Sequence, residues 1–193
     1  MWVRRAAIRP VPPFAQLPSR ALTDIEDKLG DDDDSARSRL DVAFTRFEET
    51  QPALAERISE VLGRPLDETA LALGYFLTLA IWLAFDAVFS NDLGQVSETA
   101  LASVEEAMSL DEQIRLSDPA EAVDSDDVVA MEQPDILAFV HEHVDAALEA
   151  NASEVDVDDV HVIYQVVLVE ILALSYAVRA PPNWDMPVPE FSA

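Results

Sequence analysis

Cysteine is absent from this chain of 193 residues, and glycine occurs only four times. The lack of cysteine excludes disulfides, thiolate metal sites and cysteine nucleophiles. Four scattered glycines do not form a phosphate-binding loop, and the Gly-x-Ser-x-Gly motif of hydrolase nucleophiles does not occur. The sequence therefore offers no catalytic residue and favours a non-enzymatic protein.

Basic side chains are also scarce, with twelve Lys and Arg against thirty-eight Asp and Glu and a formal charge of −26. Four of the bases lie in the first twenty residues, which contain no acid: Arg4, Arg5, Arg9 and Arg20. Residues 21–193 therefore carry eight bases and all thirty-eight acids, a formal charge of −30. Such a charge repels phosphate groups and anionic lipids, so neither nucleic acid nor a membrane surface is expected as a partner. A basic protein would be attracted.

Only three histidines are present, and their spacing does not favour a metal site. Helical carboxylate-bridged sites need a carboxylate three residues before a histidine on each of two helices. His161 follows Asp158 at that spacing, but no second pair exists. Residues 154–165 also fail as an EF-hand loop, because Asp159 stands where glycine is required and Gln165 where the bidentate glutamate is required. We predict no metal and no cofactor.

Twelve prolines divide the chain into a middle and two ends. Four lie within residues 1–19 and four within 181–193, so both ends are predicted to be extended. The other four stand where proline can begin a helix: Pro52, Pro65, Pro119 and Pro134. We therefore expect a proline- and arginine-rich arm over 1–19, a single helical domain over 20–180 and a proline-rich tail over 181–193.

Residues 1–19 and 183–193 are expected to be dispensable for folding, since extended proline-rich chain forms little helix. The exceptions would be aromatic residues that dock the ends onto the domain: Trp2, Phe14, Trp184 and Phe191. The N-terminus has the basic residues of an export signal, but prolines interrupt the apolar core that such a signal needs. A cytoplasmic location is therefore expected.

Apolar residues at helical spacing predict amphipathic helices over residues 40–47, 54–62, 96–108 and 137–148. Gly63 follows the second of these and is a candidate C-terminal cap. Ser109 and Glu112 have the spacing of a capping box, which predicts that a new helix begins after Met108. The short alternation VDVDDVHV over 155–162 is interpreted as a helix N-terminus and not as a strand.

Two stretches, 71–89 and 160–178, are apolar on almost every side. They are near the length of a membrane span, but too few bases flank them to orient one. A helix that is apolar all round is normally central in a bundle, and Gly74 then marks a close approach between helices. The sequence predicts an all-α, irregular bundle of six or seven helices around two long apolar central helices, with extended proline-rich termini.

Each of these apolar stretches contains one acid, Asp86 or Glu170, and a buried carboxylate must find a donor, shift its pKa upward or reach the surface. One interpretation is a pocket for an enzyme or ligand sensor, formed by these acids with an aromatic stripe: Tyr75, Trp82, Asp86 and Glu170. The alternative is that Asp86 lies near an exposed helix end and that Glu170 meets an arginine or a hydroxyl group.

Three functions are compatible with these features. The first is a module that docks a basic partner, as a neutraliser, a mimic of nucleic acid or a carrier. The second is the enzyme or sensor just described, and the third is an acidic surface that serves solubility only. For the first, the predicted partner-binding residues lie in two acidic segments without Lys or Arg: Asp124, Asp126, Asp127, Glu132, Glu154, Asp156, Asp158 and Asp159.

Overall fold

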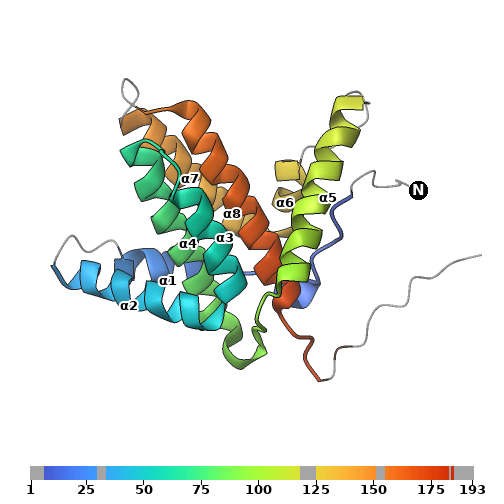
Figure 1. Cartoon of the computed structure of the whole chain (residues 1–193). Coiled ribbons are helices and arrows are strands. Elements are labelled where there is room, and N and C mark those ends of the chain that lie inside the picture. Colours follow the sequence, from blue (N-terminus) through green and yellow to red (C-terminus); the bar gives the residue numbers. More distant parts are fainter. Residues whose placement is uncertain (1–6, 30–33, 118–124, 151–154, 183, 185–193) are drawn as a thin grey trace, which may run out of the picture.

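The computed structural model describes residues 7–29, 34–117, 125–150, 155–182 and 184, which form an all-α bundle (Figure 1). The first half contains a 3-10 turn, Pro13–Ala15, and helices α1 (Ser19–Leu29), α2 (Asp34–Thr50), α3 (Pro52–Leu62) and α4 (Glu68–Phe89). The second half contains a 3-10 turn, Ser90–Asp92, and helices α5 (Glu98–Ser117), α6 (Ser125–Glu132), α7 (Pro134–Ala150) and α8 (Val157–Ala177). These ranges hold eight α-helices and no strand, which confirms the predicted class with more helices than the six or seven expected.

The two long apolar helices, α4 and α8, lie side by side at the centre of the bundle and run parallel (Figure 1). At their N-terminal ends the Asp67 carboxylate accepts a hydrogen bond from the Asp156 N–H (3.2 Å), and Asp159 accepts one from the Asp67 N–H (2.8 Å). At their C-terminal ends, Leu93 and Val178 form an isolated β-bridge. Contacts at both ends therefore fix the register of the central pair.

The shorter helices cover this pair from several sides. Helices α1, α2, α3 and α7 pack against α4, while α3, α5, α6 and α7 pack against α8. In the described residues both central helices are long and apolar enough to cross a membrane, a criterion that core helices of soluble proteins also meet. Within the bundle 56% of the most apolar stretch of each is buried, so neighbouring helices already cover more than half of those residues.

Several predicted helix ends coincide with the observed ones. Pro52 and Pro134 are the first residues of α3 and α7, where the missing N–H is not needed. Gly63 caps α3 and donates its N–H to the Ser59 carbonyl (2.9 Å). The alternating stretch at 155–162 is the start of α8, as expected, with Asp156 as its N-cap.

Two predicted helix starts are wrong, and one lies outside the described residues. Pro65 precedes the loop residue Asp67, which caps α4 by accepting hydrogen bonds from two backbone N–H groups. Ser109 lies within α5, which continues from Glu98 to Ser117 because neither proline nor glycine interrupts this run of helix-forming residues. Pro119 is outside the described residues.

Two buried glutamines hold loops to the bundle, and both immediately precede a helix-starting proline. Gln51 donates to the Gly94 carbonyl (3.0 Å) and accepts from the Val96 N–H (2.8 Å). Gln133 accepts from the Leu17 N–H (3.0 Å) and donates to the Ala15 carbonyl and the Ser175 hydroxyl (both 2.8 Å). Because a buried amide satisfies its polar groups in this way, each glutamine fixes the path of a distant segment.

The described part of the N-terminal arm packs into the core, a placement that was not predicted from the sequence. Ile8, Val11, Ala15 and Leu17 are all buried, although this segment is mostly not helical. The Phe14 ring meets the Trp184 ring edge to face at 5.1 Å, so aromatic contacts do dock the two ends, as the alternative held. Trp2 and Phe191 lie outside the described residues.

Gly74 lies where α4 passes closest to its neighbours. A β-carbon at this position would lie 2.7 Å from Leu62 Cδ2 and 2.8 Å from Ile163 Cδ1, which are tips of side chains on α3 and α8. The prediction of a close helix approach is therefore confirmed. The space available is smaller than one methyl group unless both tips move.

At position 74, a small side chain is expected to be tolerated and a large one to destabilise the protein. Gly74→Ala should change the free energy of unfolding by less than about 1 kcal/mol, because the gain in helix propensity offsets displacement of the two tips. Gly74→Leu should destabilise by about 1–3 kcal/mol through overpacking. Urea unfolding measures both, with Ala72→Leu at an exposed position of α4 as the control. Equal tolerance of leucine at positions 72 and 74 would contradict the close packing.

Candidate functional site

Five of the eight predicted partner-binding acids have described side chains. Asp127 lies exposed on α6, and Glu132 is half-buried at the end of the same helix. Asp156 is the N-cap of α8, and Asp158 and Asp159 lie in its first turn; of the three, only Asp159 is half-buried. Asp124, Glu154 and the side chain of Asp126 lie outside the described residues.

Three of these acids accept hydrogen bonds from backbone N–H groups. Glu132 accepts from the Val11 N–H (2.9 Å) and so holds the N-terminal arm. Asp156 accepts from the Asp158 N–H (2.9 Å) at the start of α8. Asp159 accepts from the loop before α4, as described above. These acids therefore have structural roles besides any role in binding.

The two acidic segments lie toward opposite ends of α8. Gln133, next to Glu132, bonds to Ser175 near the C-terminus of α8, whereas Asp159 lies in its first turn. With a helical rise of ~1.5 Å per residue, Asp159 and Ser175 are about 24 Å apart along the axis. The structure therefore does not bring the two segments together into one compact patch.

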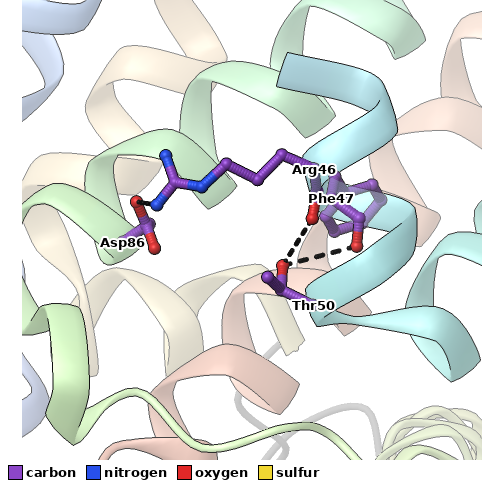
Figure 2. Close-up of polar contacts among 4 residues, drawn as sticks. All are labelled: Arg46, Phe47, Thr50 and Asp86. Carbon is purple, nitrogen blue, oxygen red and sulfur yellow. Dashed lines mark hydrogen bonds and ion pairs between the residues drawn. The ribbon is translucent and has the colours of Figure 1, made fainter. Parts of the chain in front are cut away.

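Asp86 forms an ion pair at the edge of the central helix. The Arg46 guanidinium on α2 donates to the Asp86 carboxylate at 2.5 Å, as Figure 2 shows. The same arginine lies 5.5 Å from the Trp82 ring centroid. On α2, the Thr50 hydroxyl donates to the Arg46 carbonyl (2.8 Å), one turn earlier in the same helix (Figure 2). Asp86 is thus half-buried, paired and close to a helix end, which matches the structural alternative.

Glu170 has a very different environment, because its side chain is fully buried on α8. Within the described part of the chain, neither carboxyl oxygen has a hydrogen-bond partner of acceptable geometry. Desolvation raises the pKa of Glu170 well above its ordinary value, and the Thr78 hydroxyl on α4 opposes this shift. A carboxyl group without a charged partner in such a site is held in its neutral form near neutral pH.

The two aromatic residues of the predicted pocket face different surroundings. Trp82 is fully buried, with its ring 5.4 Å from that of Phe47. Tyr75 is exposed and meets Phe44 edge to face at 5.9 Å. Tyr75 and Phe44 line a cavity of about 530 Å³ between α2 and α4, but Trp82 does not contribute to it. The structure thus does not bring Tyr75, Trp82, Asp86 and Glu170 together around a shared cavity.

A second cavity, of about 720 Å³, forms a groove between α3, α5 and α8. Its apolar lining includes Ile58 of α3, Met108 of α5 and Leu168 of α8. Its polar lining includes Glu112 of α5 and His161 of α8. We refer to it below as the α3–α5–α8 groove.

An ion pair joins two walls of this groove. The Arg57 guanidinium on α3 lies 2.5 Å from the Glu105 carboxylate on α5 and 3.4 Å from that of Glu60. Hydrogen bonding to Glu105 raises the pKa of Arg57, so this arginine stays charged. On the third wall the Tyr164 hydroxyl lies 2.8 Å from His141 Nε2.

The sequence interpretation did not identify this groove. His161 and Gln165 interrupt the apolar run of α8, and this was the available signal that one face of the helix is not covered. On α5, Glu105 and Glu112 lie on the same face of one continuous helix and mark the facing wall of the groove. This pattern was missed because a helix break was expected at Ser109.

Within the described residues, no group of three or more His, Asp or Glu side chains is placed to hold a metal ion. Comparison with protein families, with characterised proteins and with solved structures found no match to this chain. Any function must therefore be argued from the charge and geometry described above.

Proposed function

We propose that the protein is a non-enzymatic, acidic module that binds a basic partner protein. The observation that carries this proposal is the distribution of charge along the second half of the chain. No Lys or Arg occurs between Arg115 and Arg179, a span that includes α6, α7 and α8. Three of the acids on α7 are exposed and have no Lys or Arg within their own helix: Glu142, Asp145 and Glu149.

Such a surface attracts a basic protein over distances longer than a hydrogen bond. Complementary charge raises the association rate more than it strengthens the final complex, and dissolved salt screens the effect. The enzyme or sensor alternative has less support, because its four residues do not share a cavity. Solubility alone remains the competing explanation, and it predicts no partner.

The test begins with crosslinking and recovery of the partner from the native host, followed by association kinetics. Association should slow by tenfold or more between ~0.05 and ~0.5 M salt, because the Debye length shrinks to a few ångströms. Replacing four exposed acids with their amides should slow it further at low salt: Glu142→Gln, Asp145→Asn, Glu149→Gln and Asp158→Asn. Asp159 is left unchanged because it holds the loop before α4.

The matched control removes the same number of charges from helices α2, α3 and α4. Its substitutions are also at exposed positions: Glu48→Gln, Glu49→Gln, Glu56→Gln and Glu68→Gln. This control should slow association less than the α7–α8 variant. Recovery of no basic protein, or rates that respond to neither salt nor substitution, would leave solubility as the role of the acidic surface.

A further inference from the structure

The α3–α5–α8 groove combines an apolar floor with two acids on its α5 wall, Glu105 and Glu112. We propose that it receives an amphipathic helix of the partner protein, with the apolar face of that helix inward and Lys or Arg along its flanks. This inference rests on the proposed function and specifies the site and the form of the partner. Helices of this kind commonly bind grooves between helices through apolar side chains spaced three or four residues apart.

The arrangement of the helices leaves room for such a segment. Figure 1 shows α5 close to the C-terminal end of α8 and leaning away from α8 toward its own C-terminus. Near the closed end, the Gly94 N–H after α4 donates to the Ala177 carbonyl at the end of α8 (2.9 Å). The axes of α5 and α8 therefore diverge toward the C-terminus of α5 and the N-terminus of α8 (Figure 1).

Two exposed apolar residues lie one helical turn beyond the residues that line the groove on α5 and α8. Leu116 of α5 is 68% exposed and Val157 of α8 is 62% exposed. Leu116 lies four residues after Glu112, and Val157 four residues before His161, so each shares a helical face with a residue that lines the groove. From Glu105 to Leu116 the α5 wall is about 16 Å long, which matches about three turns of a partner helix.

The charges of the walls determine which helix fits. Arg57, the base that lines the groove in the described residues, is already paired with Glu105 and Glu60. Glu112 is a second acid on α5, and α8 contributes no Lys or Arg to the lining. An acidic helix would be repelled, and so would a second copy of this chain, which carries the same charge of −26. Basic flanks on the partner helix complement these walls.

The probes are three synthetic peptides of equal length, each labelled with a fluorophore. The first has leucine along one helical face and lysine elsewhere, the second has the same composition in scrambled order, and the third carries glutamate in place of lysine. Fluorescence anisotropy measures binding to the full-length protein. The first peptide should bind at least tenfold more tightly than either of the others.

Two groove variants and a control locate the binding. Ser109→Arg with Gln165→Arg places two charges on facing walls, and Ser109→Trp with Gln165→Trp fills the same space without charge. Both positions are exposed, so circular dichroism should show an intact helical fold. Each pair of substitutions should weaken binding of the lysine–leucine peptide at least tenfold. Glu48→Gln with Glu49→Gln, both exposed on α2, changes the net charge as much as the arginine pair does and should alter binding less than twofold.

The outcomes separate this inference from the proposed function. If the scrambled peptide binds as tightly, or if the groove variants bind like the parent while salt still weakens binding, the groove is not the site and the proposed function stands. If the glutamate peptide binds as well as the lysine peptide, charge complementarity is wrong and both fail. If no basic peptide binds at low salt, the groove inference fails, and recovery of a partner from the host decides the proposed function separately.

Discussion

A protein that lacks residues 1–19 is expected to lose its cooperative unfolding transition or to melt far below the parent. This deletion removes three large buried apolar side chains, Ile8, Val11 and Leu17, each worth about 1.5–3 kcal/mol in burial. It also leaves the buried amide of Gln133 without two of its partners. The free energy of unfolding of a typical domain is only about 5–15 kcal/mol, so these losses approach the whole stability of the protein. Differential scanning calorimetry and circular dichroism measure the effect.

Two comparisons make this expectation specific to the buried part of the arm. Deleting residues 1–6 alone retains Ile8, Val11 and Leu17, and it should preserve the transition. Leu17→Ala should destabilise by about 2–5 kcal/mol, as for other buried leucines. Arg20→Ala, at a side chain that is 90% exposed, should have little effect. If the protein without residues 1–19 melts within a few degrees of the parent, the arm does not stabilise the bundle.

Glu170→Gln is expected to stabilise the protein increasingly as the pH rises. In the parent, the unfolded chain releases the Glu170 proton near the ordinary pKa of 4.5, while the folded protein retains it because burial raises that pKa. The folded state then binds more protons than the unfolded state, so stability falls with rising pH by up to about 1.4 kcal/mol per pH unit for this group. The loss continues until the pH reaches the pKa of the folded state.

Glutamine has nearly the same shape as glutamate but does not titrate. The Glu170→Gln variant therefore does not lose stability through this group as the pH rises. Urea unfolding of parent and variant from about pH 4.5 to about pH 8 should give a difference in free energy that grows with pH. Glu142→Gln, on the exposed face of α7, reports the effect of removing one surface charge. Glu170→Leu should also exceed the parent in stability near neutral pH, because it removes an unpaired polar group from the core. A constant difference across the pH range would contradict the buried, neutral carboxyl group.

The central architecture was predictable because it depends on local composition. A helix that is apolar on every side, such as 71–89, can bury its surface only if other helices surround it. Its central place in the bundle therefore follows from the sequence. The helix starts at Pro52 and Pro134 depend on one missing N–H each and are equally local. Gly74 was identified for the same reason, since a glycine within an apolar helix needs an explanation in packing.

The environment of the acids was not predictable, because it depends on distant parts of the chain. Glu132 meets Val11 across 121 positions, and Asp159 meets Asp67 across 92. No local pattern distinguishes these acids from Asp158, which stays in solvent. The burial of the arm was missed because extended chain lacks the periodicity that identifies a buried helical face. A weak signal did exist, since both buried glutamines occur in a Gln-Pro pair that opens a helix.

The parallel pairing of α4 and α8 also governs the order in which the chain can fold. Their N-terminal contact joins residues 89 positions apart, and the arm meets Gln133 across 116. Such contacts close long loops, and the entropy of closure is lost before the contacts stabilise anything. A nascent polypeptide has α4 without its central partner until α8 has also been synthesised. During that interval we expect the acids already synthesised to repel those of neighbouring chains, which opposes association of the incomplete bundles.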